Sequence, residues 1–129
     1  MTGLLLDTHA LLWCWSDDPA LSPSAREAVS DTQTVVYVSA ASAWAIASKV
    51  RLGRLPEFVG ALLRFHELIA AGAMRHLAVT YMHGLRAGRY PAKHRDPFDR
   101  MLAAQAELES HLLVTRDAAF QEFPVQTLW

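Results

Sequence analysis

Short apolar runs alternate with longer segments of helical spacing along this chain. Residues 4–6 are all leucine and are followed by Asp7, and such a short apolar run is typical of a strand buried on both faces of a parallel sheet. Residues 35–38 are β-branched or aromatic, which favours a second strand. Strands are predicted at Leu4–Leu6, Val35–Val38, Leu77–Val79, Leu112–Val114 and Val125–Leu128, the last at an edge of the sheet.

Helices are predicted between these strands. Glu57–Gly72 carries an apolar residue at every third or fourth position, which predicts one amphipathic helix. Asp96–Glu109 opens with a capping aspartate followed by proline, a common helix start. The other predicted helices are Thr8–Trp15, a short one after Ser22-Pro23, Ala40–Leu52 capped by Ser39, and Tyr81 to about Gly88. Strands that alternate with helices predict an α/β fold around a mostly parallel sheet.

Composition limits the possible classes of protein. The 129 residues, with a mass of 14.3 kDa, predict a single domain over residues 1–129. Hydrophobic residues make up 52% and charged residues 19%, which excludes a disordered chain. A single cysteine, a start unlike a signal peptide and the lack of a long apolar run predict a cytoplasmic protein without a membrane partner.

Three aspartates follow the predicted strands or open a predicted helix. Asp7 directly follows the first strand, Asp117 comes shortly after Leu112–Val114, and Asp99 lies in the first turn of the helix at 96–109. The carboxyl ends of parallel strands line one crevice, so Asp7 and Asp117 are expected to share a cleft that Asp99 can join. Two carboxylates about 4 Å apart repel by about 4 kcal/mol at an effective dielectric near 20, so convergence requires a cation. Hard oxygen ligands suit Mg²⁺ or Mn²⁺.

Each of these acids also suits a second interpretation. Aspartate at a helix start accepts hydrogen bonds from backbone N–H groups and complements the helix dipole. Asp7, Asp96 and Asp117 all stand at or near predicted helix starts, so each taken alone is more typical of a cap. Their joint arrangement is what favours a metal site.

Basic residues gather beside this acidic cluster. The net charge is −1, so contact with a nucleic acid needs a local patch. A strip of cations and histidine next to a metal cleft is suited to binding a phosphodiester backbone, and a solvated surface paired with Asp96 and Asp99 is the alternative. The strip consists of Arg86, Arg89, Lys93, His94, Arg95 and Arg100.

Other site types find little support. The six histidines show no zinc-site spacing. His9, two residues after Asp7, is expected to be a half-buried structural residue, and the alternative is that it faces the cleft. No glycines of a nucleophile elbow surround the serines, and the four tryptophans are expected in the core or at a dimer interface. A receiver-like phosphoacceptor needs paired acids after the first strand and a late lysine, whereas Asp7 stands alone and Arg116 follows Thr115.

Four segments together resemble the VapC toxins of bacterial VapBC toxin–antitoxin modules, a group of PIN-domain proteins. The segments, which span nearly the whole chain in the family's order, are Leu4-Leu5-Leu6-Asp7-Thr8-His9-Ala10-Leu11-Leu12-Trp13, Val38-Ser39-Ala40-Ala41-Ser42-Ala43-Trp44, the stretch 94–106 containing Asp96-Pro97-Phe98-Asp99, and Leu113-Val114-Thr115-Arg116-Asp117. The resemblance implies a three-layer α/β/α sandwich that cleaves RNA with Mg²⁺ or Mn²⁺. It also implies a homodimer that a VapB-type antitoxin blocks.

The resemblance assigns roles to individual positions. Asp7, Asp99 and Asp117 match three of the family's metal-binding acids. Asp96 is read as a helix cap that supports the site, and Thr115 is expected to support it from beside the ligands. The ion is expected to make a water more acidic, and that water attacks phosphorus in line without a covalent enzyme intermediate.

One family acid is missing. The family places a glutamate directly after the tryptophan of a Trp-Glu-Ile-Ala-type stretch, but this chain reads Trp44-Ala45-Ile46-Ala47. Ala45 can neither bind a metal nor orient a water, which indicates an inactivated or weakened ribonuclease. A non-catalytic PIN domain that binds RNA or its antitoxin without cleavage is the alternative.

The sequence also suggests a surface for self-association. The stretch after Val50 contains Leu52, Leu55, Phe58 and Leu62, which together with exposed tryptophans could form an apolar face.

Overall fold

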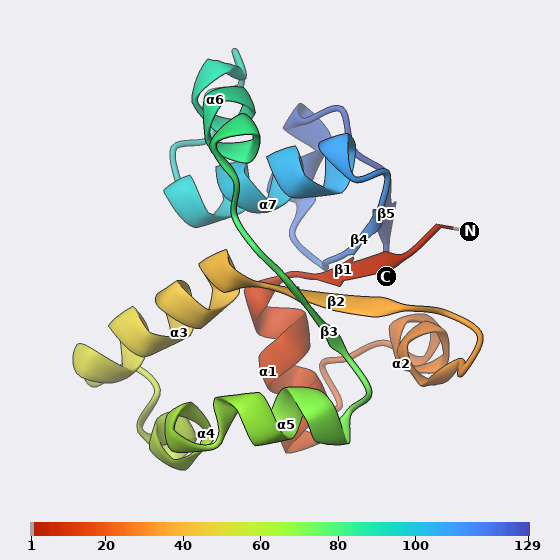
Figure 1. Ribbon diagram of the computed structural model, residues 1–129, viewed down its shortest axis with the longest axis vertical. Helices are drawn as coiled ribbons and strands as arrows, with labels where there is room; N and C mark the ends of the chain where they lie inside the picture. The colour runs from red at the N-terminus through yellow and green to blue at the C-terminus, as the bar shows by residue number, and fades with distance from the viewer. Residues whose placement is uncertain (1) are drawn as a thin grey trace.

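The computed structural model describes residues 2–129, and Met1, at which the predicted domain begins, lies outside the described residues. A five-stranded sheet in the order β3-β2-β1-β4-β5 forms the centre of the molecule (Figure 1). The strands are β1 Leu4–Leu6, β2 Val36–Ser39, β3 Arg75–Leu77, β4 Leu112–Val114 and β5 Thr127–Leu128. Every pair of neighbouring strands is parallel, so the predicted mostly parallel sheet is confirmed.

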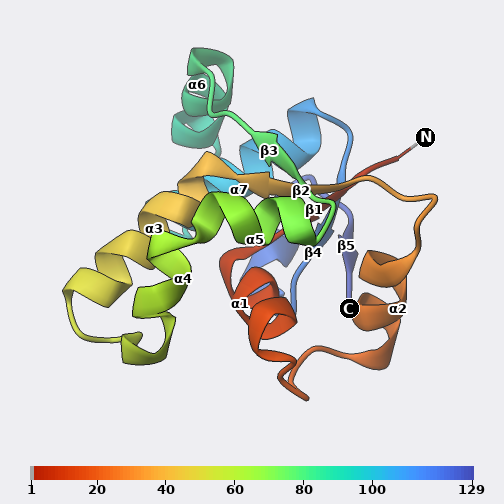
Figure 2. The same ribbon diagram turned by 60° about the horizontal axis from the view of Figure 1, so that its bottom comes forward.

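Helices cover both faces of this sheet. The segments α1 to α5 lie on one side, and α6, α7 and η2 lie on the other (Figures 1 and 2). The α-helices are α1 Thr8–Ser16, α2 Pro23–Ser30, α3 Ala40–Arg51, α4 Val59–Leu63, α5 Phe65–Ala71, α6 Tyr81–Arg89 and α7 Pro97–Leu108. Two 3₁₀ turns, η1 Pro56–Phe58 and η2 Ala118–Glu122, complete the elements. The predicted α/β/α sandwich is therefore confirmed.

The central strand divides its side chains between two cores. Leu4 and Leu6 pack with α1, α2 and α3 on one face, whereas Leu5 packs with α7 and η2 on the other. Side chains of a strand alternate between its faces, so a strand of three leucines can supply both cores. The buried position of β1 explains why Leu4–Leu6 contains no polar residue.

The predicted helix at 57–72 is broken in the structure. Pro56–Phe58 forms a 3₁₀ turn, and Arg64, with φ −117° and ψ 18°, leaves the helical region between α4 and α5. The spacing of apolar residues predicted the buried face correctly, because Phe58, Leu62 and Phe65 pack on the first core. Spacing alone does not detect a break that preserves the direction of that face.

The strand predicted at 77–79 begins two residues earlier. Arg75 pairs with Tyr37 and Leu77 pairs with Ser39, and β3 stands at the edge of the sheet, after a link at residues 72–74. Two of its three residues are exposed, and an edge strand with polar residues carries a weaker hydrophobic signal than a buried strand.

The register of the sheet brings three chain segments to one level at its carboxyl edge. Leu6 pairs with Val38 on one side and with Val114 on the other. The residues that follow, Asp7, Ser39 and Thr115, therefore lie at one level of the carboxyl edge. This edge carries the candidate site. Within residues 2–129, no helix has the length and hydropathy that spanning a membrane requires.

Candidate metal-binding and nucleic-acid site

Asp7 is a buried carboxylate at the end of the central strand. Its side chain is 6% exposed, and its Oδ1 accepts a hydrogen bond of 2.8 Å from the backbone N–H of Ala10, which caps α1. Burial raises the pKa of Asp7, and the hydrogen bonds from Thr115 and Ala10 lower it in part. The nearby charge of Asp117 raises the pKa of Asp7 further. The capping interpretation is therefore correct for Asp7, but the cap leaves a desolvated charge that a cation would stabilise.

Asp117 approaches Asp7 from the neighbouring strand. It follows β4 and caps η2, accepting a 2.9 Å hydrogen bond from the N–H of Ala119. Thr115 joins the two acids, because its Oγ1 accepts a hydrogen bond from the N–H of Asp117 and its side chain also hydrogen-bonds with Asp7. Asp7 and Asp117 line one pocket of about 250 Å³. The predicted shared cleft is present.

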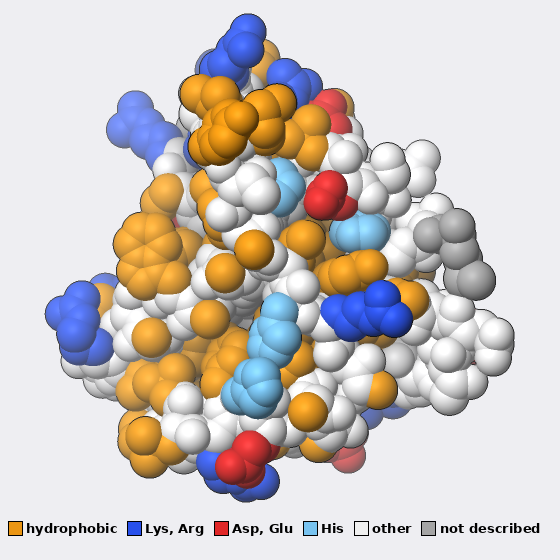
Figure 3. Space-filling model, in the orientation of Figure 1, with side chains coloured by type: hydrophobic (Ala, Val, Ile, Leu, Met, Phe, Trp, Pro, Cys, Tyr) orange, Lys and Arg blue, Asp and Glu red, His pale blue; other side chains and the backbone are white. Residues whose placement is uncertain are grey.

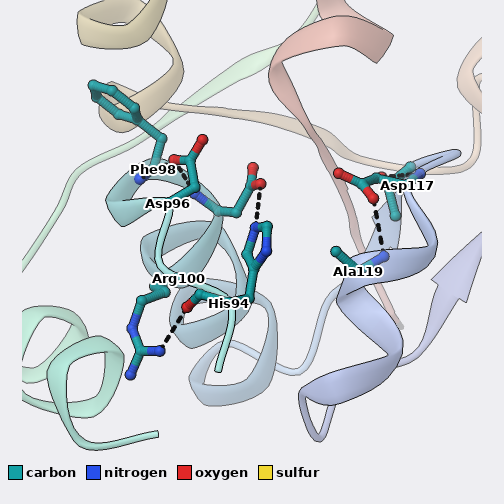
Figure 4. Close-up of polar contacts among 8 residues, drawn as sticks. His94, Asp96, Phe98, Arg100, Asp117 and Ala119 are labelled. Carbon is teal, nitrogen blue, oxygen red and sulfur yellow. Dashed lines mark hydrogen bonds and ion pairs between the residues drawn. The ribbon is translucent and has the colours of Figure 1, made fainter. Parts of the chain in front are cut away.

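Asp99 lies in the first turn of α7 and is paired with a histidine. His94 Nε2 and Asp99 Oδ2 are 2.8 Å apart, and both side chains are about a quarter exposed. The hydrogen bond with Asp99 raises the pKa of His94, and burial raises the pKa of Asp99. Figure 4 shows the carboxylate of Asp117 pointing toward the side of the site that carries His94 and Asp96. The charge of Asp117 raises the pKa of Asp99, so the two acids interact across this space.

The three predicted metal ligands are neighbours but are not gathered as closely as a formed metal centre. Asp99 does not line the pocket that Asp7 and Asp117 share. In the part of the chain that the structure describes, no three His, Cys, Asp or Glu side chains form a group that could hold a metal ion. Asp99 instead interacts with His94, which occupies one of its oxygens.

Position 45 is buried on α3. Ala45 is 2% exposed, and Ser42, one turn earlier on the same face, accepts a 3.2 Å hydrogen bond from the hydroxyl of Thr8. Because Thr8 directly follows Asp7, this bond fixes the buried face of α3 beside the carboxyl edge of β1. The position at which the family glutamate is expected thus lies on a helix face that turns toward the acids.

Asp96 caps α7, as the sequence predicts. Its Oδ1 accepts hydrogen bonds from the backbone N–H groups of Phe98 and Asp99, at 2.8 and 3.3 Å. The second of these bonds fixes the backbone of Asp99 itself, and the negative charge of Asp96 contributes to the raised pKa of Asp99. The supporting role expected for Asp96 is consistent with these contacts.

Two of the predicted RNA-contacting arginines are engaged inside the protein. Arg86 makes a two-point ion pair with Glu107, with Nε–Oε1 and Nη2–Oε2 distances of 2.6 and 3.0 Å. Arg100 donates to four backbone carbonyl oxygens, those of Ala87, Tyr90, Ala92 and His94. The alternative of pairing with Asp96 and Asp99 does not hold for these two arginines, since their acceptors are Glu107 and backbone oxygens.

The other members of the strip are more open. Arg89, Lys93 and Arg95 are exposed. Lys93, His94 and Arg95 line a second pocket of about 510 Å³, together with Gly88, Ala92 and Arg100. The cationic surface is therefore narrower than the sequence suggests and centres on residues 93–95.

Three residues of the first pocket were not predicted as site residues: His9, Trp13 and Arg116. His9 is exposed, which contradicts the expected half-buried structural role. Trp13 lies one and a half helical turns after Asp7, and Arg116 directly precedes Asp117, so proximity to the acids was the available signal.

Comparison with known proteins agrees with this architecture. The family model described as PIN domain matches residues 4–126. Among curated proteins, no sequence matches the chain.

Solved structures share the fold at low sequence identity. A DNA-bound VapBC from Salmonella typhimurium has a TM-score of 0.72 at 17% identity, with 99% of this chain and 98% of that chain covered. VapBC2 from Rickettsia felis, bound to a promoter DNA fragment, has a TM-score of 0.70 at 13% identity, with 97% and 96% covered. FitAcB from Neisseria gonorrhoeae has a TM-score of 0.61 at 21% identity, with 98% and 96% covered. Because the family model spans nearly the whole sequence, this chain belongs to the PIN domain family.

Proposed function

We propose that this chain is a VapC-type toxin, a metal-dependent endoribonuclease that cleaves RNA phosphodiester bonds and that Ala45 weakens or inactivates. PIN domains are generally nucleases, and the structural neighbours are toxin–antitoxin complexes such as VapBC. The observation that carries the proposal is the meeting of Asp7 and Asp117 around one pocket at the carboxyl edge of the sheet.

The donor set fits a hard divalent cation. Asp7 offers a buried carboxylate whose pKa is raised by burial, and Asp117 offers an exposed carboxylate beside it. Such a pair of oxygen donors, completed by waters and substrate phosphate, is the ligand set that Mg²⁺ and Mn²⁺ prefer. Asp7 and Asp117 would hold the ion, with Asp99 as the third ligand once its contact with His94 is exchanged. When bound, the ion lowers the pKa of a water molecule and offsets charge that develops on the phosphate.

The chain's own residues supply positioning. Thr115 orients both Asp7 and Asp117 through its hydroxyl, and Asp96 fixes the first turn of α7 that carries Asp99. Arg89, Lys93, His94 and Arg95 attract the RNA backbone, so affinity falls as salt concentration rises. Arg100 acts indirectly, because its four hydrogen bonds hold the segment that carries Lys93, His94 and Arg95.

Ala45 removes the fourth acid of this proposed site. The methyl side chain leaves the buried face of α3 without an oxygen donor or a proton acceptor. Fewer carboxylates reduce the attraction for a divalent ion, which weakens its binding. We therefore propose weak or absent cleavage by the chain as it stands.

The proposed partners follow from the same relationship. A VapB-type antitoxin would bind this chain and block the site, and the toxin would form a homodimer. Hydrophobic side chains gather over α6 and along α3 and α4 on the surface shown in Figure 3. Of the four residues predicted for a self-associating face, Leu52 is 54% exposed, whereas Leu55, Phe58 and Leu62 pack on the core. Trp44 on α3 and Leu63 on α4 are also exposed, at 66% and 85%.

A cleavage assay on mixed cellular RNA tests the proposal. We expect Ala45→Glu to raise Mg²⁺-dependent cleavage, and Asp7→Asn in that variant to abolish it. Ala45→Gln is the matched control, because it adds the same bulk without a charge. Equal rates for Ala45→Glu and Ala45→Gln would contradict the role assigned to the missing acid.

A non-catalytic PIN domain that binds RNA or its antitoxin is the second candidate. Ala45 and the separation of Asp99 from the pocket favour it. This candidate predicts RNA binding that persists without Mg²⁺ and no cleavage by the Ala45→Glu variant.

A further inference from the structure

The pocket beside Asp7 and Asp117 has a second wall made of flat groups. His9, Trp13 and Arg116 line the pocket together with the two carboxylates. The rings of His9 and Trp13 have centroids 5.5 Å apart and are tilted by 35°. The guanidinium carbon of Arg116 lies 4.7 Å from the centre of the Trp13 ring. A tryptophan with a cation over its face and an imidazole beside it forms one continuous stacking surface.

This wall is held in place from behind. Trp129, the last residue of the sequence, packs against Trp13 at a centroid distance of 5.6 Å with the planes at 60°. Trp13 also packs against the first hydrophobic core, so its ring is not free to rotate away. The stacking surface is thus fixed before any ligand arrives.

Arg116 and His9 keep their exposed positions on this wall. Both side chains are exposed, and among residues 2–129 Arg116 makes no side-chain hydrogen bond or ion pair. Arg86 and Arg100, in contrast, are fully engaged with protein acceptors. The guanidinium of Arg116 therefore offers one plane and its N–H donors to a ligand.

Size and chemistry limit the ligand. The pocket volume of about 250 Å³ is slightly below the ~300–1,000 Å³ of sites that enclose a drug-sized molecule, so it fits a single planar group. Proteins that recognise single-stranded RNA stack unpaired bases on aromatic rings and on arginine planes. The neighbouring carboxylates are the proposed cleavage site, so a base held here belongs to a nucleotide next to the scissile phosphate.

We propose that the His9–Trp13–Arg116 wall is a base-binding subsite that stacks one unpaired nucleobase of the RNA and thereby positions the adjoining phosphodiester at Asp7 and Asp117. This inference rests on the proposed ribonuclease function and adds a requirement that cleavage alone does not impose. An unpaired nucleotide is favoured at this position, because a base within a duplex reaches the wall only by breaking its pair and leaving its stack.

The test uses short single-stranded RNAs that contain one abasic ribose at successive positions. The parent sequence is an RNA that the Ala45→Glu variant cleaves. Binding is measured by fluorescence anisotropy with the Asp7→Asn variant of the full chain, so that the RNA stays intact. Loss of one particular base is expected to lower affinity about 5- to 150-fold, the equivalent of the ~1–3 kcal/mol of stacking per base. The affected base is expected to adjoin the cleaved bond.

Variants of the wall assign this effect to the pocket. Arg116→Lys keeps the charge and removes the plane, and Trp13→Leu keeps apolar bulk and removes the ring. In both variants, the affinity for the abasic RNA is expected to approach the affinity for the intact RNA. Arg89→Lys, at an exposed position of α6, is the matched control and retains the full effect of the abasic position. Thermal unfolding tests whether each variant is folded. If Trp13→Leu does not fold, Arg116→Lys still tests the subsite, because Arg116 is exposed.

The outcomes separate this inference from the function on which it rests. If cleavage occurs but no abasic position changes affinity, the base-binding subsite is wrong and the ribonuclease stands. The subsite is equally wrong if the abasic effect is the same in Arg116→Lys as in the parent. If no RNA is cleaved by the Ala45→Glu variant, both proposals fall.

Discussion

Arg100 donates a 2.9 Å hydrogen bond from its Nη1 to the carbonyl oxygen of His94. The same guanidinium also donates to the carbonyl oxygens of Ala87, Tyr90 and Ala92, so one side chain fixes the connection between α6 and α7. His94, held in this way, reaches Asp99. The arginine that the sequence places in an RNA-binding strip is therefore a positioning residue for the site.

Replacing Arg100 with lysine tests this role. Lysine keeps the positive charge but cannot reproduce the planar fork that serves four carbonyls. We expect Arg100→Lys to lower the free energy of unfolding by about 1–3 kcal/mol, because partly buried carbonyls lose their donors. Urea unfolding measures this loss, and Arg89→Lys is the control. If Arg100→Lys changes RNA affinity but leaves the free energy of unfolding unchanged, Arg100 contacts RNA directly and is not a positioning residue.

The burial of Asp7 predicts a conflict between function and stability. Its pKa is raised in the folded state, so the charged form is disfavoured there and stability falls as pH rises above the ordinary pKa of aspartate. Asp7→Asn keeps a capping oxygen for Ala10 and removes the charge. We expect it to raise the free energy of unfolding at pH 7 by about 0.5–2 kcal/mol.

Denaturation at two pH values distinguishes this cause. The gain from Asp7→Asn should shrink toward pH 4, where the carboxyl of the parent takes up a proton. Asp117→Asn, at an exposed position, is the matched control, and its free energy of unfolding should rise by less. A loss of stability in Asp7→Asn at pH 7 would contradict the claim that the buried charge destabilises the fold.

The ion pair of Arg86 and Glu107 predicts the opposite dependence on pH. Hydrogen bonds from Arg86 and Tyr90 lower the pKa of Glu107, although its partial burial opposes this. The pair thus stabilises the fold above the ordinary pKa of glutamate, about 4.3, and this contribution is lost as pH falls through the lowered value. The free energies of unfolding of Glu107→Gln and of the parent, measured from pH 7 to pH 3, should become equal at the acid end. Glu57→Gln, exposed on η1, should parallel the parent throughout.

Self-association offers a prediction for the apolar surface of α3 and α4. Leu63 is 85% exposed, more than any other large hydrophobic residue in the described part of the chain. We expect light scattering to give twice the 14.3 kDa of one chain, and Leu63→Lys to shift the mass toward 14.3 kDa. Met82→Lys on α6 serves as the control. A single species of 14.3 kDa for the parent would remove the homodimer from the account.

Buried features of the fold were predictable from the sequence, and features that depend on exposed partners were not. Leu4–Leu6 and Leu112–Val114 match observed strands, because runs buried on both faces have one stable arrangement in a parallel sheet. The break at Arg64 was missed, because both halves keep the same face toward the core. The edge strand β3 was misplaced, because Arg75 and His76 carry no hydrophobic signal.

The candidate site likewise contains features that the sequence predicts and features that it does not. Asp7 and Asp117 could be placed together from the order of elements alone, since parallel strands end at one edge. The partners of Arg86 and Arg100 could not, because Glu107 and the carbonyls of residues 87–94 meet them only through the packing of α6 on α7. The stacking of Arg116 on Trp13 likewise depends on tertiary packing between α1 and the segment after β4.

Titration calorimetry with Mn²⁺ tests the central claim most directly. The Ala45→Glu variant should take up manganese with a saturable heat signal, and the Asp7→Asn, Ala45→Glu double variant should lose it, because Asp7 is the buried carboxylate that lines the pocket. Manganese uptake that is absent from Ala45→Glu, or that is unchanged when Asp7 is replaced, would contradict a metal site built on these acids.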